Sequence, residues 1–231
     1  MPASPIAALL IAALCSIPAY AADADAARYD SVDRFIDTIP DADHQHIIGA
    51  YGELSGRAHK DWAGLVYFND AKGQPLQQLF ILTQGDNGKY QLAASNHADS
   101  AFGGTALNGI DQVKIARSSI TITSSWNWHG CRGGATHQFK YYKGQWRLIG
   151  VSFQRTNAKT TTEDDQTYFD ASDSITVDRN VLTGNIILKS TSATKKKGVT
   201  ETFRVAPEVL LFSDYESQQG WLDRFNGYAD C

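Results

Sequence analysis

The residues best suited to bind a partner lie together in one glycine-rich segment near the middle of the chain. Tryptophan and arginine dominate binding hot spots, and aromatic rings also serve as stacking platforms for sugars. Residues two apart in a strand share one face, and a shared aromatic face either packs in the core or contacts a partner. Both interpretations stay open for the four candidate partner-binding residues, which are Trp126, Trp128, His129 and Arg132.

Signatures of catalysis are missing from the sequence. The chain has no HExxH, no GxSxG, no phosphate-binding glycine loop followed by Lys and Ser or Thr, and no CxxC. His44 and His46 lie two apart, which suits either a metal pair or a solvated loop, and no third ligand is near them. Glu163–Asp165, Asp170 and Asp173 offer carboxylates for a glycosidase, or simply a soluble surface. We therefore predict no catalytic residue, no metal and no cofactor.

The N-terminal segment predicts export. An apolar run, Ile6–Ile17, is followed by the small-residue site Ala19-Tyr20-Ala21, which is typical of a secretory signal peptide. The run is shorter than the about 20 apolar residues that a membrane span needs. We expect a signal peptide over residues 1–21, a flexible leader over 22–28 and a single β-rich domain over 29–231. The mature protein is then periplasmic or secreted, without stable membrane insertion.

Two cysteines, Cys131 and Cys231, stay in the chain after cleavage. Since exported proteins meet an oxidising compartment, we predict a disulfide between them. A loop of about 100 residues would be closed, which the chain-entropy estimate values at roughly 4–5 kcal/mol. The alternative is a reactive thiol at Cys131, next to His129.

The charge balance argues against nucleic acid as a partner. The formal net charge is −4 and the sequence pI is about 5.8. Nucleic-acid binders need clustered positive charge to neutralise phosphates.

Short alternating runs of apolar and polar residues fill most of the mature chain, a pattern that indicates antiparallel strands with one buried face. The clearest case is Ser119–Phe153, where two runs are joined by Lys143-Gly144. The predicted strands are Leu65–Phe68, Leu79–Thr83, Lys89–Ala94, Gln112–Ala116, Ser119–Trp126, Thr136–Tyr142, Gln145–Gln154, Thr167–Ala171, Ser174–Asp178, Gly184–Lys189 and Val199–Val205.

Two short helices and one long loop complete the prediction. Residues 31–39 carry apolar side chains at helical spacing, with Asp30 or Ser31 as the cap and Pro40 as the stop. A second apolar stripe, Trp221, Phe225 and Tyr228, predicts a C-terminal helix that either packs on the sheet or binds a partner. The hydrophilic stretch 156–165 is expected to be a mobile loop. The fold class is all-β, with mainly antiparallel sheets in a sandwich or propeller-like assembly.

Several segments carry a family resemblance through their order along the chain. They are Phe35–Pro40, Gly52–Gly56, Asp61–Ala63, Gly85–Leu92, Phe102–Gly104, Trp126–Trp128, Phe139–Tyr141, Trp146–Gly150 and Asn180–Gly184. Together they resemble secreted bacterial envelope proteins with a degenerate FG-GAP/VCBS-like unit, some of which are similar to type IV secretion immunity proteins that inhibit peptidoglycan hydrolases. The resemblance spans roughly residues 33–212.

The resemblance has two implications. Family members often bind Ca²⁺ through an Asp-x-Asn-x-Asp loop, whereas the matching positions here include Arg57, which leaves Glu53 and Asp61 as candidate ligands of a degenerate site. The second implication is a function. We expect a non-enzymatic binding protein, an immunity protein or lysozyme-type inhibitor of a cell-wall hydrolase, with an envelope carbohydrate- or ligand-binding module as the alternative.

Overall fold

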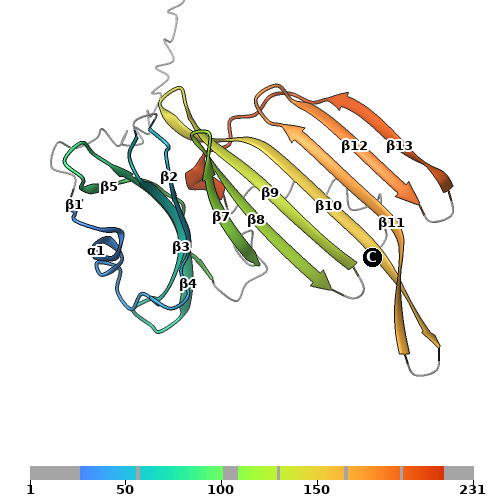
Figure 1. The fold of residues 1–231 in the computed structure, drawn as a ribbon, viewed down its shortest axis with the longest axis horizontal. Coiled ribbons are helices and arrows are strands. Elements are labelled where there is room, and N and C mark those ends of the chain that lie inside the picture. The colour runs from blue at the N-terminus through green and yellow to red at the C-terminus, as the bar shows by residue number, and fades with distance from the viewer. Residues whose placement is uncertain are drawn as a thin grey trace, which may run out of the picture.

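The computed structural model describes residues 27–55, 58–100, 109–128, 131–163, 166–192 and 195–215. Within them the chain forms two antiparallel sheets and one short helix, α1 (Val32–Ile36) (Figure 1). The prediction of an all-β fold with mainly antiparallel sheets and a short N-terminal helix is confirmed. The expected C-terminal helix lies outside the described residues.

Sheet A holds the first six strands, in the order β1-β5-β4-β3-β2 with β6 paired to β4. Sheet B is a seven-stranded meander in which each strand pairs with its sequence neighbours, in the order β13-β12-β11-β10-β9-β8-β7. The strands of sheet A are β1 (Arg28–Tyr29), β2 (Ile48–Gly52), β3 (Asp61–Asn69), β4 (Pro75–Gln84), β5 (Tyr90–Ser95) and β6 (Asp99–Ser100). Those of sheet B are β7 (Ile110–Ala116), β8 (Ser119–Trp128), β9 (Cys131–Tyr142), β10 (Gln145–Glu163), β11 (Gln166–Asn180), β12 (Asn185–Ser192) and β13 (Lys195–Arg204).

Helix α1 begins as the sequence predicts. Ser31 is the N-cap, and its side chain accepts a hydrogen bond from the backbone N–H of Arg34 at 3.2 Å. The apolar stripe of the helix, Val32, Phe35 and Ile36, is buried against sheet A. The helix therefore covers the face of sheet A that is turned away from sheet B.

Strand β3 is buried on both of its faces, which explains why its sequence is almost continuously apolar rather than alternating. On one face Trp62 and Val66 pack under α1. On the other face Leu65 joins the core shared with sheet B. The indole of Trp62 lies over two glycines that face each other across the β2–β3 ladder, Gly49 and Gly64.

Sheet B follows the predicted alternation. Ile120, Ile122, Phe139 and Leu148 are fully buried in the core between the sheets. The hairpin between β9 and β10 turns at Lys143-Gly144, whose φ angles of 51° and 83° are both positive, as a two-residue type I′ turn requires. The predicted junction between these two strands is confirmed.

The expectation of a mobile loop over residues 156–165 is wrong. Strand β10 continues to Glu163, and β11 starts at Gln166 and runs to Asn180, so the hydrophilic stretch forms a long hairpin. The two strands are held by their backbone pairing. Because this stretch has no alternating apolar residues, the sequence pattern does not reveal it as a strand. In Figure 1 this hairpin extends past the rest of sheet B at the lower right.

Residues 205–215, here called the strap, cross from sheet B towards sheet A. The last residues of the strap form a single 3₁₀ turn, and its Phe212 and Tyr215 are buried against Phe139, with ring centroids 5.2 Å apart in both cases. Backbone hydrogen bonds fix the strap at four places: Val205 N donates to Gly184 O (2.9 Å), Glu208 N to Val181 O (3.3 Å), Leu148 N to Leu210 O (2.9 Å) and His97 N to Ser213 O (3.4 Å). The strap therefore closes the core between the two sheets.

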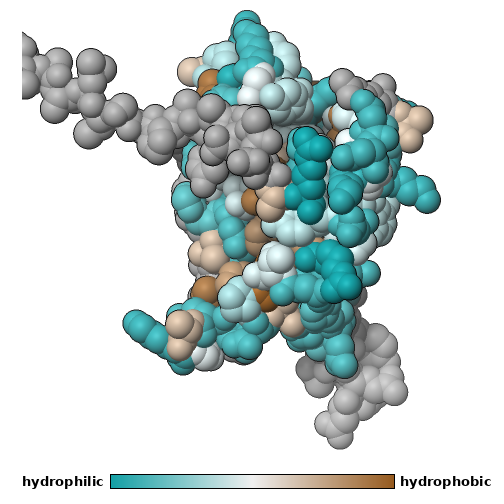
Figure 2. Space-filling model, turned by 90° about the vertical axis from the view of Figure 1, so that its left-hand side faces the viewer, coloured by the Kyte–Doolittle hydropathy of each residue, from teal (hydrophilic) through white to brown (hydrophobic). Residues whose placement is uncertain are grey.

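On the side of the molecule that carries α1, the described residues form no broad apolar surface. Hydrophobic side chains are visible there only as a narrow, broken band between hydrophilic ones (Figure 2). No helix in the described part of the chain is both long and apolar enough to cross a membrane.

Candidate functional site

One feature of sheet B has no counterpart elsewhere in the described residues: a two-stranded arm that leaves the sheet. The arm consists of residues 158–163 of β10 and 166–171 of β11, which pair only with each other, from Ala158↔Ala171 to Glu163↔Gln166. Pairing with the neighbouring strands stops at Asn157 on the β9 side and at Asp173 on the β12 side. Six residues at about 3.3 Å each give the arm a reach of roughly 20 Å (Figure 1).

A β-bulge marks the base of the arm. Asn157 pairs with Asp173 and the next pair is Ala158 with Ala171, so Ser172 is the extra residue on β11. A bulge bends the strand and increases its local twist, which redirects the hairpin away from the plane of the sheet. The bulge thus separates the arm from the seven-stranded sheet.

The predicted partner-binding residues lie at the same end of sheet B as the arm. The end of the β8–β9 hairpin pairs Trp126 with Gly133 and Trp128 with Cys131, and Cys131 in turn pairs with Asn157 at the arm's base. Arg132 is exposed there. His129 and the side chains of the two tryptophans lie outside the described part, so their contact role stays a prediction. We call this region, the arm with the adjoining hairpin end, the arm end.

The predicted disulfide also involves the arm end. Cys131 is the first residue of β9, and its backbone lies between Trp128 and Asn157. The side chain of Cys131 and the whole of Cys231 are outside the described residues, so the bridge stays a prediction.

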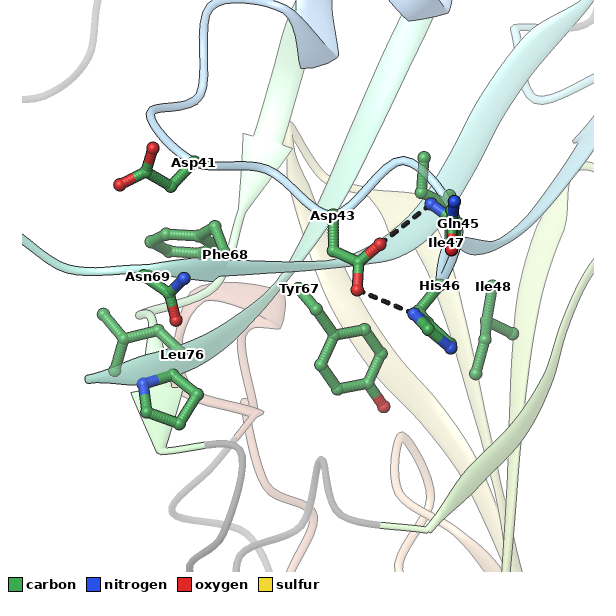
Figure 3. A pocket seen from close by; sticks show the side chains of 11 residues that line it. Asp41, Asp43, Gln45, His46, Ile47, Ile48, Tyr67, Phe68, Asn69 and Leu76 are labelled. Carbon is green, nitrogen blue, oxygen red and sulfur yellow. Dashed lines mark hydrogen bonds and ion pairs between the residues drawn. The ribbon is translucent and has the colours of Figure 1, made fainter. Parts of the chain in front are cut away.

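A second candidate site is a pocket at the opposite side of the molecule, in sheet A, with a volume of about 670 Å³. It lies between the loop that follows α1 and the ends of β3 and β4 (Figure 3). We call it the sheet A pocket. Its lining consists of Asp41, Asp43, Gln45, His46, Ile47, Ile48, Tyr67, Phe68, Asn69, Pro75 and Leu76.

A hydrogen-bonded pair stands at the rim of this pocket. Asp43 accepts a hydrogen bond from the ring Nδ1 of His46 at 2.7 Å and another from the backbone N–H of Gln45 at 2.9 Å. These bonds, chiefly the one with His46, lower the pKa of Asp43. The carboxylate therefore holds the exposed imidazole ring through its Nδ1.

The two histidines proposed as a metal pair are directed to different carboxylates. His46 contacts Asp43, whereas the Nε2 of His44 lies 3.6 Å from a carboxylate oxygen of Asp37. Across the described ranges, no three His, Cys, Asp or Glu side chains gather as metal ligands.

Asp61, a surviving candidate of the degenerate calcium site, holds the backbone instead. It is fully buried at the start of β3 and accepts three backbone N–H bonds, from Leu54 (2.7 Å), Ser55 (3.0 Å) and Gln84 (2.8 Å). A carboxylate that receives three N–H groups already has its negative charge compensated. Glu53 is exposed, and Arg57 lies outside the described residues.

A buried histidine–tyrosine pair ties the strap to sheet B. The hydroxyl of Tyr215 and Nδ1 of His137 are 2.9 Å apart in a hydrogen bond inside the core. Burial lowers the pKa of His137 to about 4 and raises the pKa of Tyr215. Both side chains are therefore uncharged at neutral pH, as the core between the sheets requires.

The acids considered for glycosidase chemistry belong to the arm and its base. Asp170 pairs with Lys159 within the arm, Asp173 lies beyond the bulge, and Glu163 is the last residue of β10. The side chains of these residues, and all of Asp164 and Asp165, fall outside what the structure describes. Backbone register alone gives them no common site.

Comparison with family models, curated proteins and solved structures finds no match for this chain. The resemblance to envelope proteins with an FG-GAP/VCBS-like unit therefore stays a prediction from the sequence. The geometry itself supplies two candidate sites, the arm end of sheet B and the sheet A pocket.

Proposed function

We propose that this chain is an exported, non-enzymatic binding protein that inhibits a cell-wall hydrolase, with the arm end as the contact surface. The arm is the observation that carries the proposal. A two-stranded hairpin without further strands or a packed helix is marginally stable in water, so a partner surface would complete it.

The shape of the arm suits insertion into a cleft. It is only two strands wide, and it starts from a seven-stranded sheet whose register is fixed on both sides of the base. A contact element held by a rigid base loses less conformational entropy on binding than a free loop does. This favours a concave partner surface, such as the active-site cleft of a glycan-cleaving enzyme.

Charge adds to the fit. Residues 158–171 contain one lysine and four acidic residues, a net charge of −3. A negative element is steered towards a positive surface, and an enzyme that works on an anionic cell wall is expected to carry one. The opposite end of sheet B has a different character, with Lys143 and Arg147 beside the ring of Tyr142.

A role without bond-breaking agrees with how the buried polar groups are used. Asp61 binds backbone N–H groups, and His137 is kept uncharged between Tyr215 and the core. These are structural tasks. Export to the periplasm, predicted from the first 21 residues, would bring the protein to the compartment where cell-wall hydrolases act.

The test is an inhibition assay with a variant that lacks the arm. Residues 158–172 are replaced by Asn-Gly, so that Asn157 and Asp173, which already pair, flank a two-residue type I′ turn. Cell-wall turbidity is followed with a lysozyme, a lytic transglycosylase and an amidase. We expect the full mature chain to slow at least one enzyme and the shortened variant to be at least tenfold weaker, with an unchanged melting transition.

The matched control is Tyr141→Ala, which removes an exposed aromatic ring at the far end of β9 and should inhibit like the parent protein. Full activity of all three enzymes in the presence of the intact chain, without detectable binding, would refute the proposed function. Equal inhibition by the shortened and intact proteins would remove the arm from the contact surface.

A further inference from the structure

We infer that the sheet A pocket is a saccharide-binding site, suited to an uncharged or amino-bearing sugar of about two rings. This inference does not depend on the arm or on the proposed inhibition. The pocket has a volume of about 670 Å³, within the roughly 300–1,000 Å³ of typical small-molecule sites.

The walls of the pocket match the apolar face of a sugar ring. Tyr67 and Phe68, whose side chains leave opposite faces of β3, each supply a separate aromatic surface, and Ile48 and Leu76 supply aliphatic surface. Aromatic rings stack on the C–H faces of sugars while their polar tips reach water or hydroxyl groups. Tyr67 is held in place because its ring packs against the core between the sheets. Burial raises the pKa of Tyr67 above its ordinary value, which is already well above neutral pH, so its hydroxyl can donate a hydrogen bond.

The polar groups around these walls are free to bind hydroxyl groups. Among the described residues, the side chains of Asp41, Gln45 and Asn69 have no hydrogen-bond partner, and the only partner of the His46 ring is Asp43, through Nδ1. Carboxylates and amides present two polar atoms in one plane, which matches a pair of neighbouring hydroxyl groups. Polar groups around an apolar hollow are the usual composition of a ligand site.

The loop that carries Asp41, Gln45 and His46 has a defined backbone conformation. Asp41 has a φ angle of 52°, in the left-handed region that residues other than glycine seldom adopt. The backbone N–H of Asp43 donates to the carbonyl of Tyr67 at 2.7 Å, which fixes the loop directly on β3. Aspartate tolerates the left-handed conformation better than most residues. The bond from Asp43 to Tyr67 holds the loop on β3, and Figure 3 shows Asp41 near Phe68 and the Asp43–His46 pair near Tyr67.

Charge selects among sugars. The lining includes Asp41 and Asp43 and no Lys or Arg. Asp43 is paired with the ring of His46, which compensates part of its negative charge. Because no Lys or Arg stands beside the two carboxylates, we expect the pocket to disfavour phosphates and uronic acids and to favour neutral or amino sugars. The expected order of affinity is therefore amino or neutral disaccharide above acidic disaccharide.

The test is a titration of the full mature chain with three soluble probes: cellobiose, N,N′-diacetylchitobiose and digalacturonic acid. Binding is measured by calorimetry and by amide chemical shifts. We expect at least one uncharged probe to bind at least tenfold more tightly than digalacturonic acid, with shift changes centred on the Asp41–Ile48 loop. His46→Ala and Asn69→Ala should each weaken that binding three- to tenfold. His46 and Asn69 are both exposed residues, so the two variants should still fold.

The arm-shortened variant serves as the matched control and should bind the sugar like the parent chain. Three results would overturn the inference: no binding of either uncharged probe, equal binding of the acidic probe, or affinity unchanged by both lining substitutions. Loss of sugar binding in the arm-shortened variant would place the site at the arm end and likewise overturn it.

Discussion

At the scale of single residues, Asp61 shows how one carboxylate organises the start of a sheet. Its oxygens join the turn after β2, through Leu54 and Ser55, to the end of β4, through Gln84. A buried backbone N–H that loses its acceptor costs about 1–3 kcal/mol. We expect Asp61→Ala to lower the free energy of unfolding by about 3 kcal/mol or more, measured by urea denaturation.

The control for this substitution is Asp86→Ala. Asp86 is exposed and lies 3.0 Å from His59 in a surface ion pair, a kind of contact that contributes about 0–1 kcal/mol. Equal losses from the two substitutions would contradict the role assigned to Asp61. A melting temperature that rises with added calcium, and stops doing so in Asp61→Ala, would return Asp61 to the ligand role that the family resemblance implies.

His137 predicts a dependence of stability on pH. Its pKa in the folded protein is about 4, below the ordinary value of 6.5, because the ring is buried. Between these pH values the unfolded chain binds a proton that the folded protein does not bind. The free energy of unfolding therefore falls as the pH is lowered through this window, by roughly 3 kcal/mol in all.

The measurement compares the parent protein with His137→Gln by urea denaturation at pH 7, 5.5 and 4. Glutamine is uncharged throughout and still offers an oxygen to the hydroxyl of Tyr215. We expect the parent protein to lose roughly 3 kcal/mol more than the variant between pH 7 and pH 4. Parallel curves for the two proteins would show that His137 does not titrate in this way.

At the scale of elements, the contact between β2 and β3 depends on two glycines. A Cβ built on Gly49 would lie 2.7 Å from Nε1 of Trp62, and one built on Gly64 would be closer still to the same ring. Because the indole is clamped between this pair and α1, it has no room to move. We expect Gly64→Ala to cost about 1–3 kcal/mol through overpacking, measured by thermal and urea denaturation.

Gly73→Ala is a useful comparison, since a Cβ there meets nothing within 4 Å and the cost comes only from its positive φ of 75°. The double substitution Gly64→Ala and Trp62→Phe makes room for the added methyl group. If it did not regain any of the free energy of unfolding that Gly64→Ala loses, the overpacking explanation would fail.

Strands that alternate around a core are predicted well from sequence, whereas only one strand of the core-less arm, Thr167–Ala171, is predicted. Alternation locates most of β8, the second part of β9 from Thr136 and the first part of β10, and the Lys143-Gly144 pair locates the β9–β10 hairpin. The far half of β10 is polar in sequence because the arm has no core to cover, so the same rule indicates a loop. The threonines at 160–162 are the signal that points to a strand, since β-branched residues favour strands.

The candidate sites also differ in how much of them the sequence predicts. Trp126, Trp128 and Arg132 stand out by residue type and lie at the arm end, although the arm itself is not evident from the sequence. The sheet A pocket is assembled from a loop and the ends of two strands, and no local motif reports such an assembly. For Asp61 the partners are backbone groups up to 23 residues away, which leave no trace in side-chain patterns.

At the scale of the whole molecule, two sheets share one core, and the strap seals it. This arrangement leaves two separate outward features: the arm end of sheet B and the pocket of sheet A. The two sheets and their shared core form the rigid part of the molecule, and the arm extends from it. We propose that this division of roles underlies a binding function, with inhibition of a cell-wall hydrolase at the arm and sugar recognition at the pocket.

The most direct test of the central proposal is amide hydrogen exchange of the mature chain, alone and with the cell-wall hydrolase that it slows most strongly. In the free protein we expect the amides of residues 158–163 and 166–171 to exchange faster than those of the neighbouring sheet, because only two strands protect them. With the enzyme present, exchange in the arm should slow at least tenfold, and exchange in the Asp41–Ile48 loop should not change. Protection confined to another surface, with the arm exchanging as before, would contradict the proposal.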